Sequence, residues 1–182
     1  MTTAAADVIA ELFASDGLAE YLGEAVTQEA HLLQAGGLAE RDDAPDPLVA
    51  AALLHDVGHF VGVISGQDLM RGTDNRHGEV GAAWLARWFG PEVTEPVRLH
   101  VAAKRYLVAI EAGYAAGLSA ASIYTLAVQG GPMSLDEIAE FEETPFGADA
   151  IRVRRWDDAA KDPDARTPDF DHFRPRLARL VV

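Results

Sequence analysis

The sequence predicts an all-α fold, organised as a single helical bundle over residues 1–182. Nearly every segment repeats apolar residues at the spacing of a helix, and none shows a sustained alternation with period two. Glycine and proline mark the ends of these segments. A length of 182 residues fits one domain better than two, and the sequence shows no internal repeat or linker.

The first expected helices precede an acidic loop. Residues 4–14 form the first, which ends near Gly17, and residues 25–41 form the second. After the loop RDDAPDP, we expect Asp46 to cap the third helix, with Pro47 at its first position. This helix, LVAAALLHDVGHFVG (48–62), is apolar nearly all round, which indicates a buried position at the centre of the fold.

The second half of the chain continues the helical pattern. Residues 63–75 lack periodicity and predict a surface loop, and the run QGGP at 129–132 breaks the chain. Ser134 and Glu137 form a capping box at the start of LDEIAEF. The other helices are expected at 76–89, from about 92 to 104 or beyond, at 120–128 and at 151–162, followed by a charged tail from about 163 to 182 that ends in a short amphipathic segment.

The composition excludes several classes of function. The formal net charge of −14 argues against binding to nucleic acid or to an anionic membrane surface. The absence of cysteine excludes disulfides, thiolate metal ligands and a cysteine nucleophile. The N-terminus has no signal-peptide pattern, and the longest apolar stretch, 48–54, is too short to span a bilayer. We therefore expect a cytoplasmic protein, and no protein partner is evident.

Five of the six histidines lie within or beside expected helices: His31, His55, His59, His77 and His100. The sharpest feature is His55-Asp56 on the almost wholly apolar third helix, with His59 one turn later. An isolated ionised carboxylate in such surroundings is costly unless it is paired or bound to a metal ion. Taken singly, a helical histidine is more often a core or surface residue, and Asp56 could belong to a buried ion pair. A metal centre satisfies all of these groups at once, and imidazole with carboxylate suits iron, zinc or manganese.

The pattern His31, His55-Asp56 and Asp157 resembles the H…HD…D signature of the HD-domain superfamily. By itself the signature suggests a metal-dependent phosphohydrolase. Further segments are similar to a narrower family: YLGE with TQEAH, then LHVAAKRYL, and LAVQGGPMSLDEIAEFE followed by RRWDD. They resemble the mixed-valent diiron oxygenases with an HD domain, which cleave carbon–phosphorus bonds of hydroxylated aminophosphonates. The resemblance runs from about residue 21 to residue 158.

The resemblance implies a dinuclear iron centre in the core of the bundle. Tyr21 matches a tyrosine that completes the coordination of the second iron in the resting state and yields to substrate. Asp158 is the less favoured neighbour of Asp157, because the tryptophan of the family directly precedes the binding aspartate, as Trp156 does here. By position, one iron is held by His31, His55, Asp56 and Asp157, and Asp56 bridges to a second iron held by His77 and His100.

The resemblance also implies contacts to the phosphonate group. Lys104 lies one helical turn after His100, where its ammonium could hold a phosphonate oxygen. Outside this context, a solvated surface lysine would be the preferred reading. His59 and Ser122 are expected to donate further hydrogen bonds to the phosphonate. With Tyr21, we expect His59 and Lys104 to take part directly in catalysis.

At the other end of the substrate, Glu24 is similar to the family's glutamate near the substrate amine, and Gln28 is expected beside it. A quaternary ammonium usually requires aromatic faces as well as a carboxylate. Tyr106, Tyr114 and Phe60 are available for that role, although the sequence does not say whether any of them lines the pocket.

The function implied by the resemblance is that of a diiron oxygenase with O2 as co-substrate. It would cleave the carbon–phosphorus bond of a small 1-hydroxy-2-(amino or trimethylammonio)ethylphosphonate and release glycine or glycine betaine with phosphate. Two alternatives stay open: a metal-dependent HD phosphohydrolase that acts on a small phosphate ester, and a non-catalytic HD binding module. The identity of the metal, the amine of the substrate and the oligomeric state also stay open.

Overall fold

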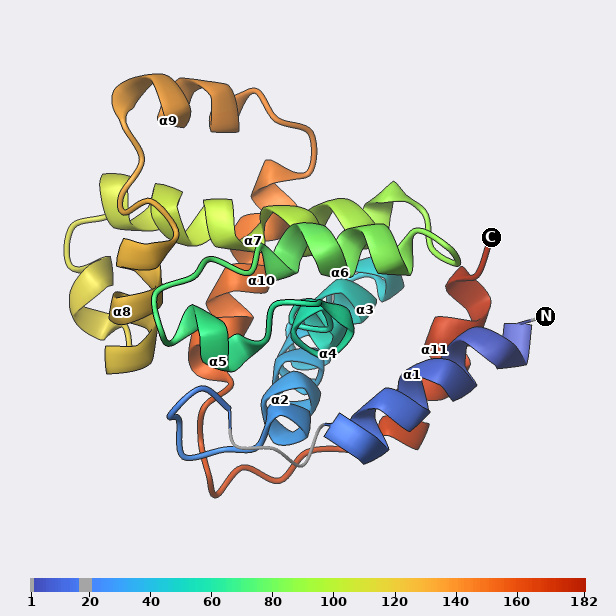
Figure 1. Cartoon of the computed structure of the whole chain (residues 1–182). Helices are drawn as coiled ribbons and strands as arrows, with labels where there is room; N and C mark the ends of the chain where they lie inside the picture. Colours follow the sequence, from blue (N-terminus) through green and yellow to red (C-terminus); the bar gives the residue numbers. More distant parts are fainter. Residues whose placement is uncertain (1, 17–20) are drawn as a thin grey trace.

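The computed structural model describes residues 2–16 and 21–182 and confirms the all-α class (Figure 1). This part of the chain contains helices and connecting loops but no β-strand. The expected stop near Gly17 lies outside the described residues. The helices are α1 (Thr2–Asp16), α2 (Gln28–Arg41), α3 (Asp46–Leu54), α4 (Gly58–Val61), α5 (Gly66–Leu69), α6 (His77–Leu85), α7 (Pro91–Ile110), the 3-10 helix η1 (Tyr114–Gly117), α8 (Ala120–Val128), α9 (Leu135–Glu142), α10 (Gly147–Ala159) and α11 (Phe170–Leu180).

The main apolar core lies around α3, which contacts α2, α7, α10 and α11. Every residue from Leu48 to Leu54 is buried, as the apolar sequence of this segment predicts. Helices α1 and α11 lie side by side along one edge of the molecule, where both chain ends are found (Figure 1). None of the described helices is both long enough and apolar enough to cross a membrane.

The single helix expected over 48–62 is wrong, because the chain turns after Leu54. The amides of Val57 and His59 bond to carbonyls three residues back, which tightens the chain before α4 begins at Gly58. A Cβ atom on Gly58 would lie 1.9 Å from the backbone oxygen of His77, so α4 packs directly against the backbone of α6. This contact requires glycine, and the turn leaves His55 and Asp56 between two helices rather than within one.

The starts of α2, α3 and α6 also differ from the expected ones. Helix α2 begins at Gln28 rather than at residue 25, because Thr27 caps it by accepting from the amide of Ala30. Asp46 is the first residue of α3 rather than its cap, and its carboxylate is bound by Arg176 at 2.8 Å and Arg179 at 2.7 Å from α11. Arg76 has a left-handed backbone with φ of 47°, so α6 begins at His77 and not at residue 76. It ends at Leu85, four residues before the expected end.

The segment 63–75 is not entirely a loop, because it holds the short helix α5. Ser65 and Asp68 form a capping box at its start, a four-residue pattern that the sequence does contain. The capping box of Ser134 and Glu137 at the start of α9 is confirmed, and α8 spans the expected residues 120–128.

Helix α10 is displaced from its expected range of 151–162. It runs from Gly147 to Ala159, and the next residue, Ala160, leaves the helical conformation with φ −88° and ψ 43°. The carbonyl of Ala160 is then free of the helix and accepts a hydrogen bond from Nδ1 of His31 at 2.9 Å. The end of α10 thus supports a histidine on α2.

Candidate metal centre

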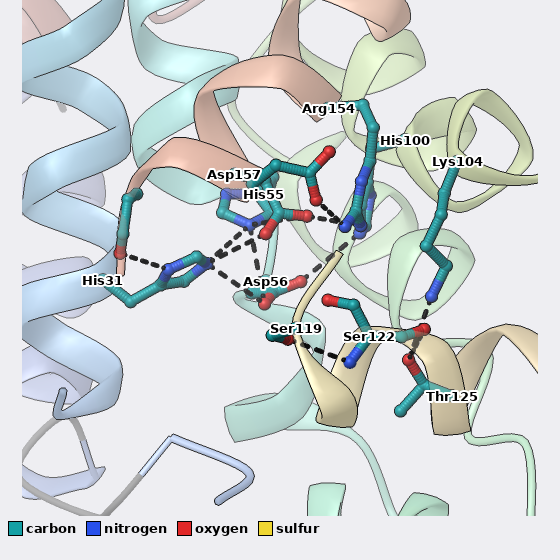
Figure 2. Close-up of polar contacts among 12 residues, drawn as sticks. His31, His55, Asp56, His100, Lys104, Ser119, Ser122, Thr125, Arg154 and Asp157 are labelled. Atoms are coloured by element: carbon teal, nitrogen blue, oxygen red, sulfur yellow. Dashed lines mark hydrogen bonds and ion pairs between the residues drawn. The ribbon is translucent and has the colours of Figure 1, made fainter. Parts of the chain in front are cut away.

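Five buried side chains meet around the buried carboxylate of Asp56 (Figure 2). Figure 2 shows His31 and His100 reaching toward Asp56 from opposite sides. The structure therefore brings together the residues for which the resemblance implies metal binding: His31 from α2, His55 and Asp56 from the turn after α3, His77 from the start of α6, His100 from α7 and Asp157 from α10.

The first group of donor atoms comprises His31, His55 and Asp157, whose ligand atoms lie within 4.8 Å of one another. Nε2 of His31 lies 3.1 Å from Nε2 of His55 and 3.5 Å from Oδ1 of Asp157. Oδ2 of Asp56 lies 3.5 Å from Nε2 of His55 and 3.8 Å from Nε2 of His31. One oxygen of Asp56 therefore faces this group.

The second group comprises His77 and His100, whose Nε2 atoms are 3.0 Å apart. The other oxygen of Asp56, Oδ1, lies 3.2 Å from Nε2 of His77 and 3.3 Å from Nε2 of His100. Asp56 thus presents one oxygen to each pair of histidines, which is the geometry required of a bridging carboxylate.

The hydrogen bonds of the four imidazoles show where their protons lie. Nδ1 faces an acceptor in every ring: a backbone carbonyl for His31 (2.9 Å), His55 (2.8 Å) and His100 (2.7 Å), and Oδ1 of Asn75 for His77 (3.1 Å). Each ring therefore donates from Nδ1 and turns the lone pair of Nε2 inward, the arrangement usual for metal-bound histidine. Burial also lowers the pKa of His31 to about 4 and that of His77 to about 3, which keeps these rings neutral at pH 7.

The facing atoms of this arrangement are all acceptors, so they suit metal ions and cannot form hydrogen bonds with one another. Lone pairs of two imidazoles face each other in each pair, and they face carboxylate oxygens that are also acceptors. Oδ1 of Asp157 is buried without a hydrogen-bond partner in the described part of the chain. Cations between these atoms would satisfy all of them, and the mixture of imidazole and carboxylate suits iron, zinc or manganese.

His59 differs from the other histidines of the site in the position of its proton. The side-chain amide of Asn75 accepts from Nδ1 of His77 and donates to Nδ1 of His59 at 2.9 Å. His59 must then carry its proton on Nε2, and this atom is buried without a hydrogen-bond partner among the described residues. Its ring stacks on that of His77 and its Nε2 lies 3.9 Å from Asp56, so donor atoms of Asp56, His59 and His77 are close enough for a metal ion. With its proton on Nε2, however, His59 acts as a hydrogen-bond donor.

Tyr21 lies against the carboxylate that joins the two groups. Its hydroxyl donates to Oδ2 of Asp56 at 2.7 Å, and its ring stacks on His31 with centroids 4.0 Å apart. Burial and the nearby carboxylate of Asp56 raise the pKa of Tyr21, so the phenol keeps its proton. The bonded oxygen is the one that faces His31, whereas the resemblance assigns Tyr21 to the iron at His77; that assignment stays a prediction.

A positively charged wall closes the pocket beside the metal donors. Lys104 is only 2% exposed, which rules out the surface reading, and its ammonium donates to Oγ1 of Thr125 at 3.0 Å (Figure 2). Burial, with the like charge of Arg154, lowers the pKa of Lys104 to about 7. Ser122 is also buried and lines the same pocket, where its hydroxyl accepts from Lys161 at 2.9 Å.

Sequence reasoning missed Arg154, although it lies one turn before Asp157 on α10. Its guanidinium is buried, lies 2.6 Å from Oδ2 of Asp157 and also contacts Asp158. Although burial raises the pKa of Asp157, the guanidinium outweighs this effect and holds the pKa well below its usual range. The hydroxyl of Tyr114 also contacts Asp158, which is thereby engaged away from the metal donors.

The two residues expected near the substrate amine lie in different places. Glu24 lines the pocket and is held by the hydroxyl of Ser119 at 2.5 Å and by the ammonium of Lys161 at 3.5 Å. Gln28 lines a neighbouring groove beside Phe60 instead, so the structure does not bring it to the metal donors. The pocket lined by Glu24 and the metal donors encloses little free space, so it fits a small ligand.

Comparisons with known proteins agree with this site. A sequence model of the HD domain family matches residues 16–135. The chain is 45% identical over 176 residues to a [1-hydroxy-2-(trimethylamino)ethyl]phosphonate dioxygenase (glycine-betaine-forming) of Leisingera caerulea, covering 96% of this chain and 89% of the relative. It is 46% identical over 164 residues to a hydroxymethylphosphonate dioxygenase of Gimesia maris, covering 90% and 81%. An uncharacterized protein of Acanthamoeba polyphaga mimivirus is 31% identical over 170 residues, covering 92% and 78%.

These matches span most of the chain and most of each relative, and they include the segments that resemble the oxygenases. The chain therefore belongs to the HD-domain family, in the group that contains these two phosphonate dioxygenases.

Proposed function

We propose that this protein is a dioxygenase that cleaves the carbon–phosphorus bond of a small 1-hydroxyphosphonate. The reaction combines R–CH(OH)–PO3²⁻ with O2 to give R–COOH and HPO4²⁻. Both oxygen atoms of O2 enter the products, the carbon is oxidised to a carboxylic acid, and the phosphorus leaves as inorganic phosphate. The names of the two relatives support the reaction class, and the site supports it with groups suited to each part of the substrate.

The observation that carries the proposal is the composition of one pocket. It combines a carboxylate shared by two pairs of imidazoles with the buried cations of Lys104 and Arg154. A negatively charged protein needs such a local concentration of positive charge to hold a small dianion.

We infer that iron occupies the centre, because a reaction with O2 needs a metal that changes oxidation state and zinc does not. When bound, such ions would supply Lewis acidity toward the substrate and electrons toward O2. One would be held by His31, His55, Asp56 and Asp157, and the other by Asp56, His77 and His100. We keep Tyr21 as a further ligand of the resting state, in accordance with the resemblance.

The protein's own groups bind and orient the phosphonate. Lys104 and Arg154 offset its charge, and His59 donates from the unpaired N–H at Nε2. Arg154 also fixes Asp157 by the contact at 2.6 Å, so one side chain orients both a metal donor and the substrate. Ser122 and Thr125 line the same wall and limit how the phosphonate can turn.

Tyr21 is the protein group closest to the bridging carboxylate on the pocket side. Its proton lies in the hydrogen bond to Oδ2 of Asp56, and a substrate that approaches this carboxylate competes with that bond. We infer that substrate binding displaces the hydroxyl of Tyr21. The residue therefore controls access to the centre.

The test is to load the purified protein with iron and measure O2 consumption and phosphate release with 1-hydroxyphosphonates. One phosphate released for each O2 consumed supports the proposal. Release of phosphate from phosphate esters without O2 uptake would instead establish a phosphohydrolase. Metal binding without either reaction would leave a non-catalytic HD module.

A further inference from the structure

We infer that Lys161 selects a phosphonate whose organic substituent carries no positive charge, with hydroxymethylphosphonate as the simplest example. This inference rests on the proposed function and narrows its substrate class. Lys161 follows the C-cap of α10, where the chain leaves the helix four residues after Asp157. Nothing in the sequence marks it, because the expected helix over 151–162 would continue through this position.

The ammonium of Lys161 is held inside the pocket by three oxygen atoms. It donates to the hydroxyl of Ser122 at 2.9 Å and lies 3.5 Å from Oε1 of Glu24 and 4.0 Å from Oδ1 of Asp157. The side chain is 13% exposed, so it is largely withdrawn from solvent. These contacts fix a positive charge at the end of the pocket where a cationic substituent would have to lie.

The negative charge of Glu24 is therefore already offset by the ammonium of Lys161. Its Oε1 accepts a hydrogen bond from Ser119 at 2.5 Å and faces Lys161, and its side chain is 14% exposed. Both of these contacts are made by Oε1, so a substrate cation that approached the other carboxylate oxygen of Glu24 would still lie close to the ammonium of Lys161. Like charges at such a distance oppose binding strongly in a partly buried site.

The pocket also lacks the aromatic faces that bind quaternary ammonium groups. Among the described residues that line the pocket, histidines apart, Tyr21 is the single aromatic residue, and its ring is stacked on His31. Tyr106 donates to Glu142, Tyr114 donates to Asp158, and Phe60 packs against Phe13. None of these three lines the pocket with the metal donors.

The charges of the pocket favour a small anion without a cationic group. Apart from histidines, the described lining residues include three carboxylates and three lysine or arginine side chains: Glu24, Asp56 and Asp157, with Lys104, Arg154 and Lys161. Bound metal ions would make the pocket positive, which suits a phosphonate dianion. A second positive charge on the substrate would reduce this attraction, and its larger substituent would need more of the limited space.

The experiment compares hydroxymethylphosphonate with the 2-amino and 2-trimethylammonio derivatives of 1-hydroxyethylphosphonate. We measure kcat and KM from O2 uptake and phosphate release by the iron-loaded protein, and Kd in the absence of O2. The wild-type protein should prefer hydroxymethylphosphonate in kcat/KM by roughly 100-fold, with formate and phosphate as products. The same preference should appear in Kd, because it arises from binding.

Lys161→Met removes the charge and keeps a side chain of similar length. It should narrow the preference by roughly 10-fold or more, chiefly by lowering KM for the two cationic compounds. Lys161→Arg keeps the charge and should keep the preference. Arg155→Met is the matched control, because Arg155 is an exposed cation on α10 that pairs with Glu111, and it should leave the preference unchanged.

Preferred turnover of a cationic compound by the wild-type protein would overturn the inference while the dioxygenase stands. An unchanged preference in Lys161→Met would overturn the role of this residue in the same way. Failure of all three compounds to consume O2 would overturn the proposed function, and the inference with it. If Lys161→Met does not fold, the wild-type preference and its retention in Lys161→Arg decide the question.

Discussion

Replacing Asn75 by leucine tests whether one amide sets the proton positions of two histidines. Leucine has a similar size but makes neither of the two hydrogen bonds that Asn75 forms, at 2.9 Å to His59 and 3.1 Å to His77. Both imidazoles are buried, so each Nδ1 loses its partner without gaining water. A buried polar group left without a partner costs about 1–3 kcal/mol, so the free energy of unfolding of the metal-free protein should fall by about 2–6 kcal/mol.

The effect on metal binding should be confined to one of the two groups. His77 loses the acceptor that keeps its proton on Nδ1, whereas His31 and His55 keep their backbone carbonyls. Loss of such a supporting partner typically weakens metal affinity by roughly 10- to 100-fold. The metal content after competition with a chelator should therefore fall from two toward one ion per chain in Asn75→Leu.

Gln34→Leu provides the matched control. Gln34 is also a buried amide with two hydrogen bonds, at 2.9 and 3.1 Å, but both go to the backbone of residue 162 rather than to an imidazole. The Gln34→Leu variant should lose a similar amount of unfolding free energy in urea to Asn75→Leu, but it should keep both metal ions. Equal metal content in Asn75→Leu and the wild-type protein, or equal loss in both variants, would refute the assignment of proton positions.

Three further predictions follow from the site and its supports. Asp56→Ala should abolish binding at both metal positions in elemental analysis, and retention of two ions would show that Asp56 does not bridge. Lys104→Met should weaken phosphonate binding, measured without O2, by roughly 10- to 100-fold at pH 6. The Kd values of the variant and the wild-type protein should converge as the pH rises above about 7. The reason is that the pKa of Lys104 is lowered to about 7, so its positive charge is lost there. In urea unfolding, Gly58→Ala should destabilise the fold by about 3 kcal/mol, because the added Cβ would meet the backbone of His77. Gly117→Ala is the control and should be neutral, because its Cβ would contact nothing within 4 Å.

The fold class and most helices could be predicted from the sequence, because amphipathic periodicity and capping residues are local signals. The capping box at Ser134 and the buried run from Leu48 to Leu54 are examples in which the local pattern agrees with the structure. The break after Leu54 could not be predicted in this way. It depends on the close approach of Gly58 to another helix, and nothing in its own segment records that contact.

The site was predictable to a similar extent. Histidine and aspartate are conspicuous on apolar helices, and the resemblance named the members of the metal centre by position. Asn75, Arg154 and Lys161 were missed because an asparagine in an expected loop and basic residues on a charged helix look ordinary in sequence. Their roles arise from what surrounds them: two imidazoles, the carboxylate of Asp157 and the carboxylate of Glu24.

The expected helices fail mainly where the site needs a different backbone. The turn after Leu54 carries Asp56, each of whose oxygens meets a separate pair of histidines. The left-handed residue Arg76 starts α6 at His77 and leaves Asn75 beside its ring. The early end of α10 releases the carbonyl of Ala160 to His31 and turns Lys161 into the pocket. Each departure exchanges regular helical hydrogen bonds for a contact within the site, as expected where function rather than stability determines the local structure. Irregular backbone near a cluster of donor atoms is therefore the feature that sequence periodicity cannot supply, and here it positions both the metal donors and the residue that we infer to select the substrate.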